Sequence, residues 1–395
     1  MTSSSFKGER LKNARLYRGL TLAELATKTD VTKQALSQYE NGTINPEMPK
    51  VLALSESLGF PLDYFFAASQ YSVKTEATYF RSLMSTNKKD RVAQSVRIEF
   101  IAQIYETLFE YINFPPLHLP EVSITDSSEA YEYEAANEVD ELEAVAQKVR
   151  EYWHLGDGPI KDLRYTLEAN GIVVTCYDPN SDKIDAFSQR TLIDEGGTFF
   201  IVISKKNQSL ARARFDMAHE LAHILIHPWS EDLESITKEE FKARERQANI
   251  MASAFLLPRE TFGADVAHYP TNLDYYEHLK KKWNVSIQAM IYRTQQLGLI
   301  TTTQYQYLMR QISKKQWRNN EPGDIPYEMT SNLLQGAVDA LLREKVFTAD
   351  SFMLALKNKG IVLQREEVEA LLCLKSGTLK RTDSDKPVLI QLKPR

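Results

Sequence analysis

Apolar and polar residues recur at helical spacing through the first 66 residues, and the pattern is cut into short pieces. Thr21 and Thr32 each stand directly before one piece, where a hydroxyl side chain can cap the first turn of a helix. The pattern predicts five short helices, at 8–19, 22–29, 33–40, 47–59 and from 61 onward. The second and third, joined by the segment TDV, have the arrangement of a helix-turn-helix.

The rest of the chain combines helical periodicity with a few β-rich runs. Residues 67–112 predict helix, and the segment FPPLHLPEVS ends it. Three runs rich in β-branched and aromatic residues predict strands, at 171–178, 185–193 and 198–206. Helices are expected at 215–227 and about 238–257, then over most of the remainder, with a final strand at PVLIQLK. The expected fold is α+β and mainly helical.

These elements divide the chain into four expected parts. A helix-turn-helix domain covers 7–66, a helical connector with an acidic linker covers 67–136, a domain with a small sheet covers 137–300, and a mostly helical C-terminal region covers 301–395. No internal repeat is found. The C-terminal region offers no pattern that assigns it a role.

Composition narrows the class of protein. With 43% hydrophobic and 26% charged residues, the chain is expected to be a folded soluble protein. No apolar run approaches the ~20 residues that span a bilayer, and the N-terminus lacks a secretory signal. Cys176 and Cys373 lie in apolar surroundings and predict buried free thiols, which places the protein in the cytoplasm. The net charge of -5 argues against a general polyanion binder but allows a small DNA-reading module.

The segment FDMAHELAHILIH, at 215–227, carries three of the seven histidines. On a helix, His219 and His223 lie one above the other, about 6 Å apart along the axis, so both rings can bind one ion. Glu220 lies about 100° around the helix and can reach a water on that ion. This H-E-x-x-H spacing predicts a Zn²⁺ site with two histidine ligands and Glu220 as the general base.

His227 is two turns from His219, about 12 Å along the axis, which is too far for a shared ion on a straight helix. The alternatives are a metal ligand and a hydrogen-bonding histidine in the last turn before Pro228. The geometry favours the hydrogen-bonding interpretation.

A third protein ligand is expected from the segment ERQANIMASAFLLP. Glu245 is followed on the same side by Ala248, Asn249 and Ala252, which are small enough to let this helix approach the histidine helix. Other acids lie in a more polar stretch where a solvated role is expected; they are Glu231, Asp232, Glu234, Glu239 and Glu240.

The segments RARFDMAHELAHILIH, ERQANIMASAFLLP and LKKKWNVSIQAMIYRTQQLGLI together resemble the ImmA/IrrE family of metallopeptidases. In that family the glutamate of a later E-x-x-A-N helix completes the metal site, which implies a ligand role for Glu245. The segment DAFSQ is similar to the family's strand before the active helix. Residues 7–66 resemble the helix-turn-helix of XRE-type regulators, and the resemblance to fusions of both parts extends to about residue 320.

In a helix-turn-helix the second helix enters the major groove, here the helix at 33–40. Its exposed face would contact bases, while residues beside it would hold phosphates. The resemblance implies a structural ion pair between Arg15 and Glu40. The family often has a glutamine near the start of the preceding helix, where this chain has Leu22, so one expected polar contact is missing. The alternative is a protein-binding module without DNA binding. The expected DNA contacts are Thr32, Lys33, Gln34, Ser37, Gln38 and Asn41.

The combined interpretation is a cytoplasmic transcription regulator with a zinc-dependent endopeptidase domain. It would bind an operator in double-stranded DNA as a homodimer, and would cleave a repressor-like protein or a toxin–antitoxin partner in a stress or phage response. A peptide would add a strand to the sheet, with 198–206 as the expected edge. The alternatives are a transcription factor whose peptidase-like domain senses a metal or ligand, and an antitoxin that binds a partner without cleaving it.

Overall fold

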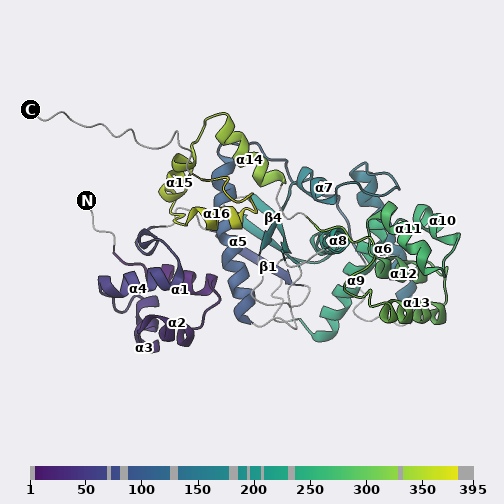
Figure 1. The fold of residues 1–395 in the computed structure, drawn as a ribbon, viewed down its shortest axis with the longest axis horizontal. Helices are drawn as coiled ribbons and strands as arrows, with labels where there is room; N and C mark the ends of the chain where they lie inside the picture. Colours follow the sequence, from purple (N-terminus) through teal and green to yellow (C-terminus); the bar gives the residue numbers. More distant parts are fainter. Residues whose placement is uncertain are drawn as a thin grey trace, which may run out of the picture.

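The computed structural model describes residues 5–68, 73–80, 88–124, 132–177, 186–193, 196–205, 209–229, 236–327 and 332–380. The helix-turn-helix lies at one end of the molecule, a small sheet lies in the middle, and a group of helices forms the other end (Figure 1). The expected mainly helical α+β fold is confirmed. Within the described residues, none of the helices is long and apolar enough to cross a membrane.

The N-terminal helices begin where the local sequence predicts. Thr21 and Thr32 both cap helices, since each hydroxyl accepts a hydrogen bond from the backbone N–H three residues later. The fifth expected helix is a single 3-10 turn. The elements are α1 (Gly8–Tyr17), α2 (Leu22–Thr29), α3 (Lys33–Glu40), α4 (Met48–Leu58) and η1 (Leu62–Phe65).

Helix α1 crosses the end of α3 at very short range. A Cβ atom on Gly8 would lie 2.2 Å from the carbonyl oxygen of Tyr39, so only glycine permits this approach. The Arg15 guanidinium donates to both carboxylate oxygens of Glu40, at 2.6 and 2.8 Å, as the resemblance to XRE-type regulators implies. These two contacts hold the recognition helix against the first helix.

The sheet contains four strands in the order β1-β3-β4-β2. Strand β3 (Ala186–Ile193) is antiparallel to both β1 (Val73–Phe80) and β4 (Gly196–Ser204), and β2 (Ile172–Tyr177) is parallel to β4. The three expected strands are therefore present. The expectation that 198–206 forms an exposed edge is wrong, because β4 is paired on both sides and the outer strands are β1 and β2.

Strand β1 was expected to be helical, as part of 67–112, and this prediction is wrong over Val73–Phe80. Its sequence VKTEATYF alternates β-branched and charged residues only over VKTE, which is a short signal for a strand. The strand forms because β3 offers a backbone partner more than 100 residues later in the chain, and such a partner leaves no local signal. The expected helix begins at Lys88, as α5 (Lys88–Phe109).

Two helices cover opposite faces of the sheet. Phe187 on β3 lies beside Ile98 and Ile101 of α5, whereas the next residue, Ser188, contacts α8 (Leu210–Ile226). Figure 1 shows α5 and α8 on the two sides of the strands. Behind α8 pack α9 (Lys238–Leu256) and then α6 (Glu132–Tyr152). Part of the expected acidic linker is thus helix from Glu132, and 125–131 lies outside the described residues.

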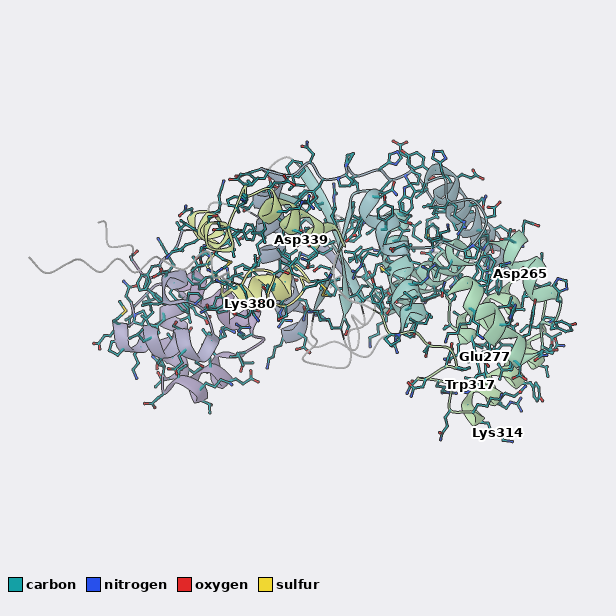
Figure 2. The ribbon with its side chains drawn as sticks, turned by 45° about the horizontal axis from the view of Figure 1, so that its top comes forward. Asp265, Glu277, Lys314, Trp317, Asp339 and Lys380 are labelled. Carbon is teal, nitrogen blue, oxygen red and sulfur yellow. A yellow bond between two sulfur atoms is a disulfide. The ribbon has the colours of Figure 1, made fainter. Side chains whose placement is uncertain are left out.

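The remaining helices form two groups. Near the sheet lie α7 (Leu163–Ala169) and the C-terminal helices, and the others form the end opposite the helix-turn-helix, where Figure 2 labels Asp265, Glu277 and Trp317. The expected strand PVLIQLK lies outside the described residues. The other helices are α10 (Arg259–Ala267), α11 (Leu273–Trp283), α12 (Ile287–Gln296), α13 (Thr302–Lys314), α14 (Asn332–Arg343), α15 (Ala349–Asn358) and α16 (Arg365–Leu371).

The C-terminal helices contact the helix-turn-helix. Glu367 of α16 accepts hydrogen bonds from the Tyr17 hydroxyl and from Arg18, the latter at 3.0 Å. The Arg10 guanidinium donates to the carbonyl oxygen of Gly360 at 3.0 Å. The same helix α16 packs against β2 and α5, so the C-terminal helices join the N-terminal helices to the sheet.

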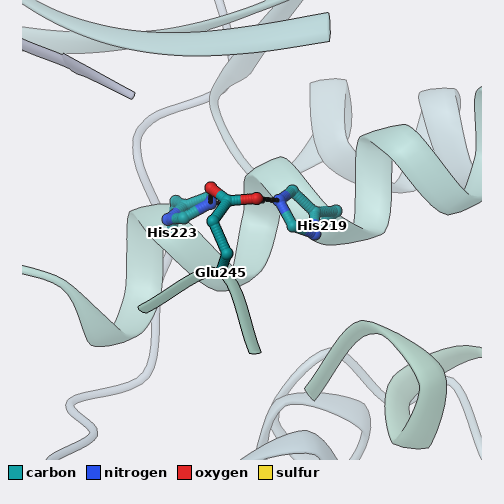
Figure 3. A group of neighbouring side chains, drawn as sticks. All are labelled: His219, His223 and Glu245. Carbon is teal, nitrogen blue, oxygen red and sulfur yellow. Dashed lines mark hydrogen bonds and ion pairs between the residues drawn. The ribbon is translucent and has the colours of Figure 1, made fainter. Parts of the chain in front are cut away.

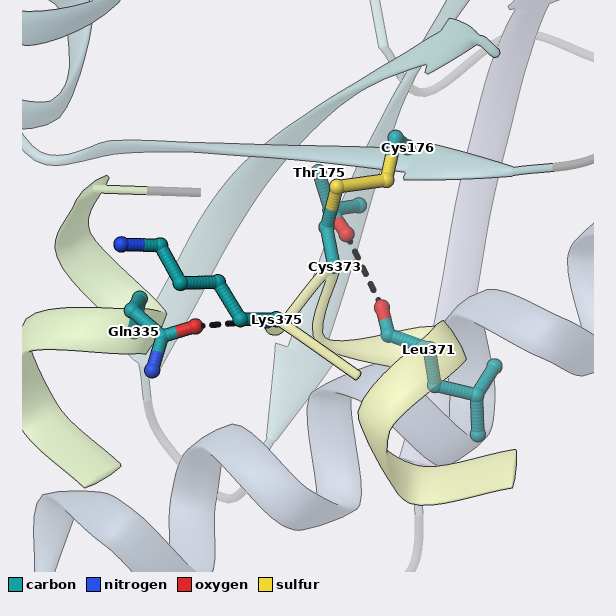
Figure 4. The surroundings of a disulfide bond; sticks show 6 residues. All are labelled: Thr175, Cys176, Gln335, Leu371, Cys373 and Lys375. Carbon is teal, nitrogen blue, oxygen red and sulfur yellow. Dashed lines mark hydrogen bonds between the residues drawn. A yellow bond between two sulfur atoms is a disulfide. The ribbon is translucent and has the colours of Figure 1, made fainter. Parts of the chain in front are cut away.

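Cys176 of β2 and Cys373, just after α16, form a disulfide with their Cα atoms 5.6 Å apart (Figure 4). The prediction of two free thiols is wrong, although both residues are buried as expected. Thr175 reinforces the junction, because its hydroxyl donates to the carbonyl oxygen of Leu371 at 2.9 Å. The sequence could not reveal the pairing, because 197 residues separate the two cysteines.

We expect Cys373→Ser to lower the stability of the C-terminal helices against the sheet. Closing a loop of this length stabilises the folded state by about 5 kcal/mol in the chain-entropy account. Urea unfolding followed by tryptophan fluorescence should give a lower midpoint for the variant than for oxidised wild type. Wild type in reductant is the matched control and should unfold with the variant; a variant as stable as oxidised wild type would contradict the expectation.

Candidate functional site

Almost every face of helix α8 is buried, and this burial fixes the position of the H-E-x-x-H residues. Ser209 caps the helix by accepting from the backbone N–H of Arg212 at 3.3 Å, and the helix ends where His227 becomes extended. Met217, Leu221 and Ala218 are at most 1% exposed, so the helix cannot rotate without exposing core. The polar motif residues are therefore held in fixed directions inside the protein.

His219, His223 and Glu245 converge (Figure 3). The Nε2 atoms of His219 and His223 are 3.1 Å apart, and they lie 3.4 and 3.3 Å from Glu245 Oε2 and Oε1. Two donors that bind zinc tetrahedrally at about 2.0–2.1 Å stand about 3.3 Å apart. The two nitrogens and the carboxylate thus have the chemistry and the spacing to hold a metal ion, and this group is the one found among the described residues.

Glu245 reaches the histidines because α9 lies close to α8. Ala248 and Ala252 are fully buried, and Asn249 donates from its amide to the backbone carbonyl oxygen of Glu245 at 2.7 Å. Of the other acids considered, Glu239 and Glu240 lie at the exposed start of α9, where Glu240 pairs with Arg244 at 2.6 Å. The other three, Glu231, Asp232 and Glu234, lie outside the described residues.

The charge state of Glu245 suits a ligand. Burial raises the pKa of its carboxyl group, but the hydrogen bonds and charges of His219 and His223 outweigh burial and lower the pKa to about 2. The carboxylate is therefore ionised at neutral pH.

Glu220 lies on the same helix, fully buried, and faces the sheet. Its Oε2 accepts a hydrogen bond from the Ser188 hydroxyl of β3 at 2.6 Å. Sequence reasoning did not identify Ser188. Its only signal was its place in DAFSQ, the segment that resembles the family's strand before the active helix.

His227 is not in the metal-binding group, and the hydrogen-bonding interpretation describes it correctly. Its Nδ1 lies 2.8 Å from Nδ1 of His223, and its Nε2 lies 3.1 Å from Oε1 of Gln247. Burial, followed by the charge of His223, lowers its pKa well below 6.5, so the ring is neutral at pH 7. Gln247 and its partner Glu138 were not anticipated from the sequence.

The recognition helix α3 presents a mixed surface at the outer side of the N-terminal domain (Figure 1). Lys33, Gln34 and Asn41 are exposed, while Ser37 and Gln38 are half-buried. Leu36 is fully buried and holds the helix to the domain core. The Thr32 side chain is occupied by capping, since it accepts from the N–H of Ala35 at 3.1 Å, which leaves its backbone for a phosphate contact.

Two family models match separate parts of the chain. Residues 11–65 match the family model for the helix-turn-helix, and residues 167–295 match the model for the IrrE N-terminal-like domain of peptidase family M78. Both parts of the resemblance seen in the sequence are thereby confirmed.

Two relatives match a 75-residue stretch. They are uncharacterized HTH-type transcriptional regulators of Rickettsia prowazekii and Rickettsia conorii, each 31% identical over 19% of this chain. The match spans 58% and 60% of the relatives' own lengths. Residues 11–65 are thus similar to a helix-turn-helix, and residues 167–295 are similar to an IrrE N-terminal-like domain, which together support a role in transcription regulation.

If the three side chains bind one metal ion, His219→Ala, His223→Ala and Glu245→Ala should each lose most of the metal, because each removes a donor atom. Wild type incubated with Zn²⁺ and desalted should hold about one ion per chain, measured by atomic emission. Glu239→Ala, on the exposed start of the same helix α9, is the control and should retain it. Full retention in Glu245→Ala would exclude Glu245 as a ligand.

Gln38→Ala should reduce discrimination between operator and random duplex by about 1–3 kcal/mol if the amide pairs with a base edge. Gel shifts on the DNA upstream of the protein's own coding sequence measure this. Gln306→Ala, an exposed glutamine of α13, is the matched control and should bind as wild type does. Equal affinity of wild type for specific and random duplex would favour the protein-binding interpretation.

Proposed function

We propose that this protein is a DNA-binding transcription regulator whose second domain is a Zn²⁺-dependent endopeptidase. The observation that carries the proposal is the convergence of His219, His223 and Glu245; the buried Glu220 directly follows His219 on the same helix. Two imidazoles and one carboxylate form a donor set typical of catalytic zinc sites, which leave one coordination position open. The match of 167–295 to a peptidase family supports the same assignment.

His219, His223 and Glu245 would hold the zinc ion. When bound, zinc supplies Lewis acidity, which lowers the pKa of water at the open position to about 7 and polarises a peptide carbonyl. Glu220 would accept a proton from a water molecule as the water oxygen bonds to the peptide carbonyl carbon, and would donate it to the amine nitrogen as the C–N bond breaks. The hydrogen bond from Ser188 would keep Oε2 of Glu220 oriented and leave Oε1 to act as the base.

The proposed substrate is a repressor-like protein or a toxin–antitoxin partner, cleaved in a stress or phage response. A peptide that adds a strand would pair with an outer strand, β1 or β2, or would displace β1 from β3. The helix-turn-helix would bring the peptidase to an operator. One such domain contacts few base pairs, so a homodimer on a two-fold site is the proposed assembly.

One observation favours a second function, in which the domain senses a metal without cleaving. Glu220 and His219 are fully buried and His223 is 1% exposed, so in this conformation a polypeptide has no direct access to the general base. A metal sensor needs the ligands but has no use for Glu220. The two functions therefore differ in what they require of this one residue.

Glu220→Gln should abolish cleavage and leave metal binding almost unchanged, because glutamine keeps the shape of glutamate but cannot accept the proton. The test mixes zinc-loaded wild type or variant with repressor-like proteins encoded beside it, and follows every chain by intact mass.

Glu239→Gln, which makes the same change at an exposed position of α9, should cleave as wild type does. Cleavage by Glu220→Gln at the wild-type rate would exclude the assigned base. If no chain is cut by any of the proteins while metal still alters DNA binding, the sensor function is correct.

A further inference from the structure

A chain of buried polar side chains leads away from the metal group and crosses three helices. His223 Nδ1 lies 2.8 Å from Nδ1 of His227, which is at the end of α8. His227 Nε2 lies 3.1 Å from Oε1 of Gln247 on α9. The Gln247 amide nitrogen donates to Oε1 of Glu138 on α6 at 2.8 Å. His227, Gln247 and Glu138 are each 6% exposed, so their hydrogen bonds are shielded from water.

We propose that Glu138, Gln247 and His227 act as positioning residues that determine which ring nitrogen of His223 carries a proton, and so present its Nε2 as a metal ligand. The inference rests on the proposed function in one respect, that the group of His219, His223 and Glu245 binds a metal ion. It does not depend on whether the protein cleaves peptides.

We call the hydrogen-bonded chain Glu138–Gln247–His227–His223 the relay. Glu138 determines which partner donates and which accepts in each of its hydrogen bonds. An ionised carboxylate only accepts hydrogen bonds, and Glu138 also forms an ion pair with the Arg246 guanidinium. Gln247 must therefore turn its NH₂ group toward Glu138, which leaves its carbonyl oxygen facing His227. That oxygen is an acceptor, so His227 must carry its proton on Nε2.

The same reasoning continues to the metal group. A neutral imidazole protonated on Nε2 has an unprotonated Nδ1, which can only accept. His223 then donates from its own Nδ1–H to His227, and the lone pair of its Nε2 points to His219 and Glu245. This is the tautomer that a metal ion requires of a histidine bound through Nε2.

The opposite direction leaves unfavourable contacts. If His227 donated from Nδ1, its unprotonated Nε2 would face the Gln247 oxygen, and both atoms are acceptors. If the Gln247 amide turned over, its oxygen would instead face the carboxylate of Glu138, which again brings two acceptors together. Glu245 is a competing acceptor, because its Oε1 lies 3.3 Å from His223 Nε2 and favours a proton there. The relay instead favours the proton on Nδ1 of His223, which leaves Nε2 unprotonated and able to bind a metal ion.

The first test measures zinc affinity in the full-length protein by competition with a chromophoric chelator. His227→Leu and Gln247→Leu replace the relay by apolar groups of similar size, and each should weaken zinc binding about 10–100-fold, as is usual for groups that orient a metal ligand. Circular dichroism and thermal unfolding check that both variants fold. Wild-type affinity in the folded His227→Leu protein would overturn the proposal.

The second test separates direction from packing. In the double variant Glu138→Gln, Gln247→Glu the carboxylate and the amide exchange places. The new amide at position 138 can donate to the new carboxylate at position 247, and that carboxylate still accepts from His227 Nε2–H, so the direction at His227 is preserved. The double variant should bind zinc much more tightly than Gln247→Leu and close to wild type. An affinity no better than that of Gln247→Leu would contradict the directional relay.

A spectroscopic readout is independent of affinity. In zinc-loaded protein with ¹⁵N-labelled histidine, His227 should show a protonated Nε2 and an unprotonated, hydrogen-bonded Nδ1; the reverse tautomer would overturn the proposal.

Failure of the proposed function gives a different result. If wild type binds no zinc, both the zinc-peptidase function and the positioning role are excluded. If Glu220→Gln cleaves as wild type does while the zinc affinities are as expected, only the peptidase mechanism is excluded.

Discussion

The close approach of α8 and α9 is the constraint on which the metal group depends. Ala248 and Ala252 follow Glu245 on the same side of α9, and both are small and fully buried. At this separation the carboxylate of Glu245 reaches both histidines from a different helix. A larger residue at either position would force its neighbours to shift, while leaving the H-E-x-x-H sequence intact. The motif is therefore necessary for the site, and helix packing completes it.

Local signals explain how much could be predicted from the sequence. Helices α2 and α3 begin at their capping threonines, and His219 and His223 share a face because one helical turn separates them. Strand β1, the disulfide and the contact of Gln247 with Glu138 were missed for the opposite reason. Each joins residues more than 100 positions apart, and nothing near either partner indicates the other. Glu245 could be proposed from the small residues that follow it on the same side of its helix, and the family resemblance supported that choice.

The C-terminal helices explain how the two recognised parts of the chain can influence each other. Neither family match reaches residues 332–380, yet these residues contact α1 through Glu367 and Gly360 and contact β2 through α16. A change in how α16 packs on the sheet would alter the orientation of the helix-turn-helix. The segment without an assigned role thus adds a second physical connection between the helix-turn-helix and the sheet, beside α5, which packs on both α1 and β3.

The disulfide turns most of the second half of the chain into a covalent ring that runs from Cys176 to Cys373 and includes both α8 and α9. A single backbone cut inside this ring opens it without releasing a fragment, so the mass of the oxidised protein would rise only by one water molecule. A cut before Cys176 instead frees the N-terminal helices from any covalent link to the ring. In the oxidised protein, a cut before Cys176 would therefore separate the helix-turn-helix from the metal group, whereas a cut within the ring would leave them covalently linked.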